Sequence, residues 1–422
     1  MRSLTLTDWL FISTVLAIWV LLFYHVILTF AGYRRFVASF SEEENSPGIS
    51  LESYPTVSVL VPAHNEEQVI GRTVEALARL EYPKDRIEII VVNDSSTDGT
   101  GNVLAEKQKV YPFLKIVTIN PPLGAKGKSN ALNQGFLASS GEYIVIYDAD
   151  NTPERRAVRR LVERIVNDPE LGAVVGKFRT RNKNANILTR FVNIETLNFQ
   201  WTVQAGRCSL FGLTTITGTN FLIRRSILEK IEGWNIKALT EDTELTVRLY
   251  DEGYYITWVP DSVTWEQEPE KWRIWIKQRT RWARGNLGVI NYYIRNIFKL
   301  RNKRIAGDII YFFFTYGIFF FSILVSDAIF LLGLLGRSNL TLTGPFTIIW
   351  FMAYAMFIFE SFISVNFESG EGTFLNLLLI CLMYFTYCQL WLFVVVKATI
   401  SAISDRISGT NARWYKTERS GG

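Results

Sequence analysis

The sequence predicts an α/β domain with a mostly parallel sheet, placed between α-helical membrane segments. Between about residues 50 and 300, apolar strand-like runs alternate with helical stretches, and long apolar runs flank this region on both sides. Continuous apolar strands that alternate with helices are typical of a parallel sheet covered on both faces. Hydrophobic residues make up 48% of the 422 residues and charged residues 20%, which fits a water-soluble domain joined to membrane spans.

The first long apolar run extends from Trp9 to Phe30. It is long enough for a transmembrane helix, since about 20 residues cross the hydrocarbon core. Arg34 and Arg35 follow the run, which predicts that this end lies in the cytoplasm. A cleaved signal peptide is the alternative, but the run is long for one and no small-residue cleavage site follows it. We expect residues 1–40 to form a transmembrane helix and linker.

Four buried strands are expected in the first part of the central region, at residues 56–61, 87–92, 114–119 and 143–147, with a helix over 66–80. Polar clusters follow three of these runs, at residues 62–67, 93–100 and 148–151. Ligands of open parallel sheets bind at the carboxyl ends of the strands, so these clusters predict one site. No GxGxxG or GxxxxGK[ST] motif occurs, which argues against a dinucleotide site or a P-loop.

Asp148 and Asp150 stand one residue apart at a predicted strand end. Alternate side chains of an extended segment point the same way, so both can approach one divalent ion that bridges a diphosphate. Mg²⁺ and Mn²⁺ prefer such oxygen ligands, with phosphate and water completing the shell. The alternative is an ordinary Asp-rich turn.

Asp94 ends the second strand and can accept a hydrogen bond from a base or ribose; an ordinary turn is the alternative. Lys128 opens a predicted helix, where it could pair with phosphate or simply be solvated. Asp242 precedes an amphipathic helix over residues 245–250 and could cap that helix, or act as a general base toward an acceptor hydroxyl.

Residues 272–294 are rich in Trp and Arg. This segment predicts an interfacial helix in which Trp272 and Trp275 lie in the headgroup layer, while Arg281 and Trp282 face the site.

Three more apolar runs, at residues 309–335, 346–367 and 374–396, predict C-terminal membrane spans. Asp327 and Glu360 lie inside them and either line a polar conduit or pair locally near a helix end. Three spans after a cytoplasmic domain leave the C-terminus outside, yet the basic tail at 401–422 favours the inside. Either one segment is re-entrant or interfacial, or the charge rule is overridden.

Composition argues against a nucleic-acid-binding protein, a disulfide-rich protein and a zinc protein. The net charge of +5 suits a surface near anionic lipid, whereas a nucleic-acid groove would need clustered basic residues. The chain has three cysteines without a CxxC pair and two distant histidines, so neither a disulfide framework nor a zinc site is expected.

The motifs together resemble the membrane-embedded family 2 glycosyltransferases, which include cellulose, hyaluronan and poly-N-acetylglucosamine synthases. The resemblance covers about residues 55–300 and rests on motifs in family order: Val61-Pro62-Ala63-His64-Asn65-Glu66, Asn93-Asp94, Lys128, Asp148-Ala149-Asp150, Thr240-Glu241-Asp242 and Gln278-Arg279-Thr280-Arg281-Trp282. No regulatory domain follows the last span, so the chain looks more similar to poly-N-acetylglucosamine synthases than to bacterial cellulose synthases.

The resemblance implies a GT-A (Rossmann-like) domain over residues 50–300, membrane helices over 305–400, a UDP-sugar donor, and Mg²⁺ or Mn²⁺ as cofactor. It implies Asp242 as the catalytic base and Asp148 and Asp150 as metal ligands. The implied donor-binding residues are Pro62, His64, Glu66, Asp94, Lys128, Asp148 and Arg281, and the implied acceptor-binding residues are Gly218, Glu241, Gln278 and Trp282.

The implied reaction is an inverting transfer that extends a β-linked polysaccharide and couples it to export, with UDP-N-acetylglucosamine favoured over UDP-glucose. The enzyme would be a multi-pass plasma-membrane protein with a cytoplasmic catalytic domain. Its partners would be the growing polysaccharide and membrane lipid, with room for a small membrane accessory subunit and no nucleic acid. The alternatives are a non-processive transferase with a lipid acceptor, and a transporter or inactive scaffold.

Overall fold

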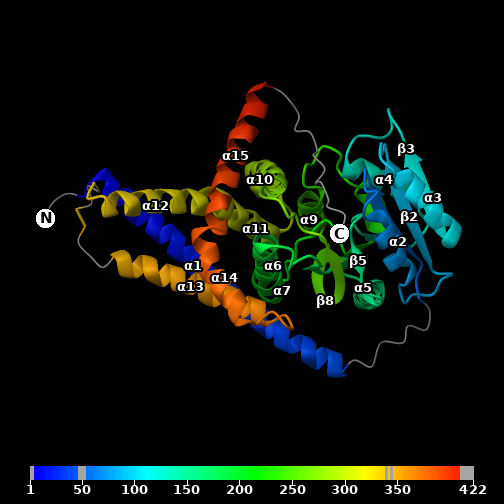
Figure 1. Cartoon of the computed structure of the whole chain (residues 1–422), viewed down its shortest axis with the longest axis horizontal. Helices are drawn as coiled ribbons and strands as arrows, with labels where there is room; N and C mark the ends of the chain where they lie inside the picture. The colour runs from blue at the N-terminus through cyan, green and yellow to red at the C-terminus, as the bar shows by residue number, and fades with distance from the viewer. Residues whose placement is uncertain (1–3, 46–53, 338–340, 343–345, 409–422) are drawn as a thin grey trace.

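A computed structural model of the chain describes residues 4–45, 54–337, 341–342 and 346–408. It contains one eight-stranded sheet in the order β3-β2-β1-β4-β7-β6-β8-β5. The sheet lies at the right-hand side of the molecule in Figure 1. The strands are β1 (Val57–Ala63), β2 (Ile87–Asp94), β3 (Leu114–Ile119), β4 (Tyr143–Ile146), β5 (Thr152–Pro153), β6 (Leu171–Thr180), β7 (Phe221–Arg224) and β8 (Tyr255–Glu266). The four predicted strands are therefore confirmed as β1 to β4.

The predicted parallel arrangement holds for one part of the sheet. Strands β3, β2, β1 and β4 pair in parallel, and β6 pairs with β8 in parallel. Strand β7 runs antiparallel to both β4 and β6, and β5 runs antiparallel to β8. The sheet is thus more mixed than predicted, because β7 enters between β4 and β6 in the opposite direction.

Helices cover both faces of the sheet, as the apolar strands predict. One face packs on α2 (Ile70–Ala78), α3 (Thr100–Val110) and α5 (Ala157–Val166). The other packs on α4 (Lys128–Leu137), α8 (Arg225–Lys230) and α9 (Glu241–Asp251). Along β1, Val59 and Val61 join the first core and Leu60 joins the second, the alternation expected of a strand buried on both sides.

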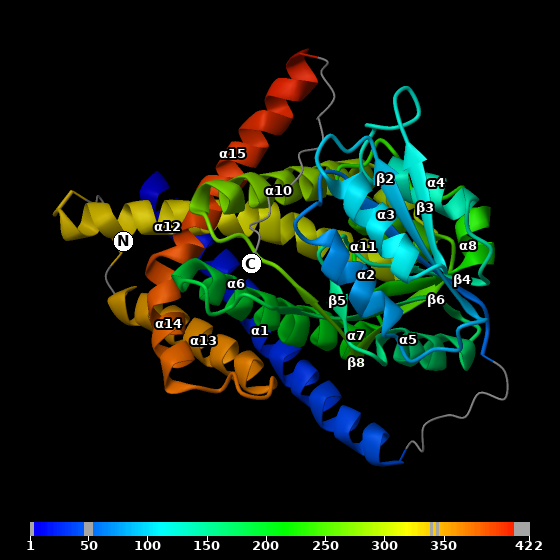
Figure 2. The same ribbon diagram turned by 45° about the vertical axis from the view of Figure 1, so that its right-hand side comes forward.

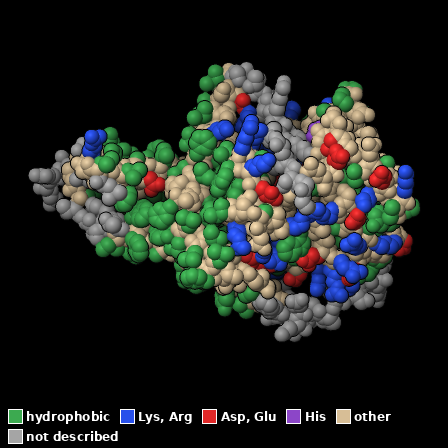
Figure 3. All heavy atoms as spheres, in the orientation of Figure 1, with side chains coloured by type: hydrophobic (Ala, Val, Ile, Leu, Met, Phe, Trp, Pro, Cys, Tyr) green, Lys and Arg blue, Asp and Glu red, His purple; other side chains and the backbone are tan. Residues whose placement is uncertain are grey.

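A helical region extends away from the sheet (Figure 1). It contains α1 (Leu6–Asn45), α6 (Ile187–Asn198), η1 (Phe199–Gln204), α7 (Ala205–Phe211), α10 (Trp272–Arg295), η2 (Ile297–Lys299), α11 (Lys303–Phe313), η3 (Phe314–Phe319), α12 (Phe320–Leu334), α13 (Phe346–Asn366), α14 (Phe374–Phe385) and α15 (Tyr387–Ser408). In Figure 3 hydrophobic side chains gather over α12 and α13, while charged side chains are spread over the sheet domain.

Four helical segments of the described part are long and apolar enough to cross a membrane: Leu6–Ser39, Lys303–Gly333, Ile348–Asn366 and Tyr387–Asp405. The first three agree with the predicted runs. The run 374–396, expected as one span, is divided at Thr386, where the backbone leaves the helical region at φ −122° and ψ −80°. The 12 residues of α14 are about 18 Å long, too short to cross a bilayer alone.

The division at Thr386 turns the chain toward the sheet domain. In Figures 1 and 2, α15 crosses the direction of α12 and α13 steeply and lies beside α10. The contact is maintained by Tyr387 and Trp391, which pack against Trp275 of α10. Trp275 is therefore fully buried, and its predicted place in the headgroup layer is wrong; Trp272 is 39% exposed. The basic tail beyond residue 408 lies outside the described residues.

The two acidic residues within the apolar runs have different surroundings. Glu360 of α13 is buried, which agrees with a side chain that faces the protein interior. Asp327 of α12 accepts a hydrogen bond from Trp350 of α13, so it is paired, but it is paired with another helix and in the middle of α12 rather than near a helix end.

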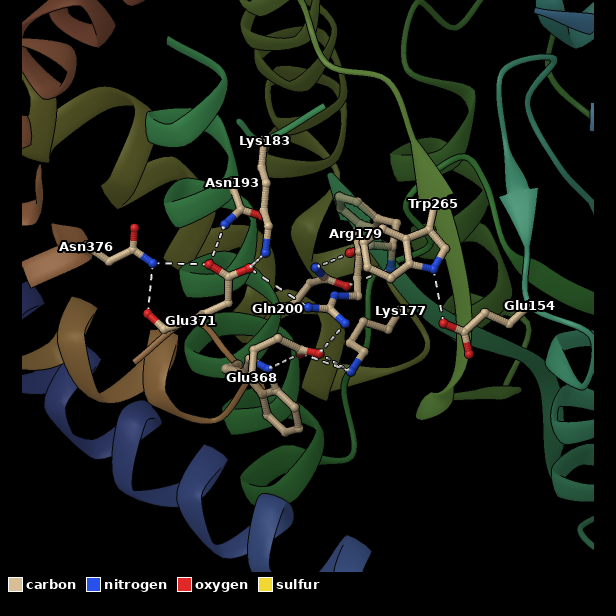
Figure 4. A network of polar contacts seen from close by, with 12 residues as sticks. Glu154, Lys177, Arg179, Lys183, Asn193, Gln200, Trp265, Glu368, Glu371 and Asn376 are labelled. Carbon is tan, nitrogen blue, oxygen red and sulfur yellow. Dashed lines mark hydrogen bonds and ion pairs between the residues drawn. The ribbon is translucent and has the colours of Figure 1, made fainter. Parts of the chain in front are cut away.

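The turn between α13 and α14 is docked on the sheet through buried ion pairs (Figure 4). Glu368 lies 3.0 Å from Lys177 Nζ and 3.3 Å from Arg179 Nη1, both on β6. Glu371 pairs with Lys183 just beyond that strand. Removing one partner of a buried pair leaves an uncompensated charge, which typically costs about 3–5 kcal/mol. The membrane helices and the sheet therefore form one packed unit at this point.

Candidate active site

The predicted site residues converge on one cavity of about 950 Å³ at the carboxyl ends of β1, β2 and β4. Strand ends supply Pro62, His64, Glu66, Asp94, Asp148 and Asp150, and the helical elements and loops supply Lys128, Gly218, Glu241, Asp242, Gln278, Arg281 and Trp282. The structure thus brings together every residue predicted for the site. Their individual roles stay predictions.

The ends of β1 and β2 form one wall of this cavity. His64 Nδ1 lies 2.6 Å from the Asp94 carbonyl oxygen, and the Glu66 amide donates to Thr100 Oγ1 at 2.7 Å. Asp94 is only 4% exposed, and its Oδ1 accepts from the Ala125 amide at 2.6 Å. These bonds fix a buried carboxylate at the edge of the cavity, where it can accept a hydrogen bond from a nucleobase.

The centre of the cavity contains Lys128 and three carboxylates, those of Asp148, Glu241 and Asp242. Lys128, the first residue of α4, places Nζ 2.6 Å from Asp148 Oδ1, 3.3 Å from Glu241 Oε1 and 2.8 Å from the Gly218 carbonyl oxygen. Burial alone would lower the pKa of Lys128, but the charges of Asp148 and Glu241 outweigh burial and raise it. The lysine therefore stays charged and offers a cation to a phosphate group.

Asp242 lies in the first turn of α9, two residues after the N-cap residue Thr240, and its Oδ1 accepts a hydrogen bond from the Thr243 amide at 2.7 Å, so it bonds to the start of the helix without being the N-cap residue. Burial and the neighbouring Glu241 charge raise the pKa of Asp242 to about 7, against opposing effects of Lys128 and Arg281. A carboxylate with this pKa can accept a proton near neutral pH, as a general base must.

Gly218 closes the cavity beside this base. Its φ of +80° is a conformation that side chains with a Cβ rarely adopt, and a Cβ here would lie 3.0 Å from Asp242 Oδ2. Glycine thus allows the backbone to approach the base closely.

Asp148 and Asp150 could supply two of the ligands of a metal ion. Asp150 is 3% exposed, and its Oδ2 accepts from the Gln267 amide at 3.2 Å. No group of three or more His, Cys, Asp or Glu side chains able to hold an ion occurs among the described residues. The two aspartates would therefore hold Mg²⁺ or Mn²⁺ together with donor phosphate oxygens and water, which these ions commonly retain.

Helix α10 supplies the remaining wall. Gln278, Arg281 and Trp282 are spaced by three and four residues, which places them on one face of the helix toward the cavity. Trp282 and Asp242 also line a second, inner cavity of about 280 Å³ between the sheet domain and the membrane helices. Its apolar lining includes Val289, Ile290, Ile305, Ile309 and Phe312. The predicted base thus lies where the two cavities meet.

Sequence reasoning missed several wall residues. Phe178 of β6 and Glu268 after β8 line both cavities, and Glu195 and Arg279 line the inner one. Arg279 could have been predicted from the sequence, because it stands three residues before Trp282 and therefore faces the same side of the helix. No sequence pattern indicated Glu195, Phe178 or Glu268, since the strands and helices that position them were not predicted.

Comparison with known proteins identifies the family. The family described as "Glycosyltransferase like family 2" matches residues 55–285, more than half of the chain. The chain belongs to glycosyltransferase family 2. This glycosyltransferase is 48% identical over 412 residues to the probable glycosyltransferase YdaM of Bacillus subtilis (strain 168), covering 97% of each chain.

Other relatives are more distant. The glycosyltransferase is 31% identical over 267 residues to the poly-beta-1,6-N-acetyl-D-glucosamine synthase of Staphylococcus epidermidis, covering 63% of this chain and 61% of that protein. The mannosyltransferase PcManGT from Pyrobaculum calidifontis, solved with GDP-Man and Mn2+, has a TM-score of 0.60 at 18% identity, covering 90% of this chain and 98% of its own. This likeness confirms the predicted GT-A fold with helical apolar segments.

Proposed function

We propose that this family 2 glycosyltransferase moves a sugar from a UDP-sugar onto a growing β-linked polysaccharide at a membrane. The observation that carries the proposal is the meeting of two cavities at Asp242 and Trp282. The large cavity has a carboxylate for a base and a partly buried lysine for phosphate, whereas the inner one leads from the base toward the membrane helices. A donor on one side and an acceptor on the other would meet at Asp242.

The proposed chemistry is one inverting displacement. An acceptor hydroxyl oxygen forms a bond to C1 of the donor sugar while the bond from C1 to the diphosphate breaks. Asp242 takes the hydroxyl proton, and Lys128 and Arg281 stabilise the charge that develops on the departing UDP. A bound Mg²⁺ or Mn²⁺, held by Asp148 and Asp150, would supply further charge neutralisation at the diphosphate. An α-linked donor would then give a β-linked product.

Two similarities and one feature of the sequence support the finer assignment. The staphylococcal relative is named for a poly-N-acetylglucosamine product, which favours UDP-N-acetylglucosamine as donor and a polymer as acceptor. The Pyrobaculum structure was solved in complex with GDP-Man and Mn2+, which favours a divalent ion. Arg34 and Arg35 after the first apolar run favour a cytoplasmic catalytic domain, because positive residues flank the cytoplasmic ends of spans.

A lipid acceptor is the second candidate, and one observation favours it. The exposed surface of the inner cavity is mostly apolar, with Ile305, Ile309 and Phe312 among its lining residues, although about half of the lining residues are polar or charged. Such a lining suits an alkyl or isoprenoid chain, whereas a polysaccharide needs hydrogen-bond partners for its hydroxyl groups. On this alternative the enzyme adds one sugar and releases the product into the membrane.

A donor screen with product sizing separates these candidates. The full chain, purified in detergent and returned to lipid nanodiscs, is supplied with labelled UDP-N-acetylglucosamine, UDP-glucose or GDP-mannose and Mg²⁺ or Mn²⁺. We expect label from UDP-N-acetylglucosamine in high-molecular-weight, glycosidase-sensitive material, and none with Asp242→Asn. A single labelled species that partitions into organic solvent would support the lipid acceptor. Incorporation only from GDP-mannose would refute the UDP-sugar assignment.

A further inference from the structure

Three hydrogen-bond donors converge on one carboxylate beneath the acceptor wall. Glu195, on α6, accepts from Arg279 Nη2 at 2.7 Å, from the Tyr387 hydroxyl at 2.7 Å and from Trp391 Nε1 at 2.6 Å. Tyr387 in turn accepts from Trp275 Nε1 at 2.9 Å. The donors come from α10 and α15, so this carboxylate joins three helices that are far apart in the sequence.

Arg279 connects this cluster to the site. It is 1% exposed, and its guanidinium carbon lies 4.2 Å from the centre of the Trp282 ring. Burial would lower the pKa of Arg279, but the Glu195 charge raises it, so the guanidinium stays charged beside the indole. A desolvated cation on an aromatic face is held strongly, which fixes the position of the ring.

The stacking leaves one face of Trp282 for a ligand. Arg279 covers one face of the indole, while the side chain is still 36% exposed and lines both cavities. The uncovered face is flat, apolar and next to the base, which suits the C–H face of a sugar ring. Its orientation depends on Arg279, and Arg279 depends on Glu195.

We propose that Glu195 is a positioning residue for the acceptor: it holds Arg279 against Trp282 and, through Tyr387 and Trp391, makes the acceptor platform depend on α15. This inference deepens the proposed function and rests on a sugar acceptor that contacts Trp282. A merely structural cluster would instead affect the amount and thermal stability of folded protein without changing acceptor affinity selectively.

The test compares Glu195→Gln with the matched variant Glu163→Gln in the full chain in nanodiscs. Glu163 is also a glutamate bonded to an arginine, at 2.7 Å from Arg159; it is buried, whereas Glu195 is partly buried, and it lies on α5 away from both cavities. For each folded variant, donor hydrolysis by water and the acceptor KM are measured on one preparation. We expect Glu195→Gln to keep donor hydrolysis and to raise the acceptor KM about tenfold, and Glu163→Gln to change neither.

Two further variants separate the loss of acceptor positioning from any effect of misfolding. Tyr387→Phe deletes only one hydroxyl and should raise the acceptor KM in the same direction by a smaller factor. The double variant Glu195→Gln/Arg279→Met removes both charges. On our proposal its thermal stability recovers while the acceptor KM stays high, because Trp282 has lost its support. Recovery of both quantities would show that only an uncompensated charge mattered and would overturn the proposal.

Other outcomes of these experiments would also test the positioning role of Glu195. An unchanged acceptor KM in folded Glu195→Gln, or equal losses of donor hydrolysis and elongation, would overturn the positioning role. If Trp282→Ala leaves the acceptor KM unchanged in the same assay, the failure lies in the proposed acceptor site itself. The two failures are therefore distinguishable.

Discussion

The pH dependence of transfer is the sharpest test of the proposed base. Burial and the Glu241 charge raise the pKa of Asp242 to about 7. A general base works only in its deprotonated form, so activity should be present above this pKa and be lost as the pH falls through it. With a pKa of about 7, about a tenth of Asp242 is charged at pH 6 and about nine tenths at pH 8.

The expected result is therefore about a tenfold rise in kcat/KM between pH 6 and pH 8, because kcat/KM reports groups of the free enzyme. Asp242→Asn keeps the size of the side chain but cannot accept the proton. It should lower transfer by about 10²–10⁴ while donor binding stays near the original value, and the acidic limb should disappear. Initial rates across the pH range, with donor affinity from calorimetry, give these quantities.

Two neighbours should move the acidic limb in opposite directions. Lys128 lowers the pKa of Asp242, so Lys128→Gln should shift the limb to higher pH. Glu241 raises the pKa of Asp242, so Glu241→Gln should shift the limb to lower pH. His64→Gln serves as control, because histidine is the side-chain type that changes charge near neutrality. If the limb vanishes with His64→Gln, or if Asp242→Asn retains it, Asp242 is not the base.

Three further predictions follow from the site. Asp150→Asn should nearly abolish transfer, and excess EDTA should do the same to the unchanged enzyme until Mg²⁺ or Mn²⁺ is restored; full turnover in EDTA would contradict a metal requirement. Trp282→Ala should impair polymer elongation much more than donor hydrolysis, measured on the same folded protein; unchanged elongation would remove Trp282 from the site. Gly218→Ala should lower transfer and destabilise the protein by about 1–2 kcal/mol, since φ is +80° and the Cβ would lie 3.0 Å from Asp242 Oδ2. Thermal unfolding and initial rates would show the two effects, and an unchanged rate would place Asp242 farther from Gly218 during turnover.

Much of the site could be predicted because its residues follow regular elements. Asp94 and Asp148 come directly after buried apolar strands, and a parallel sheet brings such strand ends to one edge. Gln278 and Trp282 share a helix face by their spacing of four residues. These rules depend only on residues that are close along the chain, so they can be applied to a single sequence.

The rest depended on contacts between distant segments. Strands β6 and β8 were not predicted, and β7 runs against β4, so the order of the second half of the sheet could not be read from local pattern. The apolar run 374–396 indicated a single span because hydropathy does not record where a helix bends. Its break at Thr386 allows Tyr387 and Trp391 to bond to Glu195, almost two hundred residues earlier.

That distant contact changes how the membrane part is understood. Helix α10 carries Gln278, Arg281 and Trp282 toward the large cavity, and Trp275, two turns before Trp282 on the same side of the helix, packs on α15. Near the other end of this contact, Arg284 of α10 pairs with Asp405 of α15. The aromatic packing at one end of this contact and the ion pair near the other restrict the rotation of α10 about its own axis, and this rotation decides which side chains face the cavity. On the proposed function, the C-terminal helices therefore support the acceptor wall as well as providing candidate membrane spans.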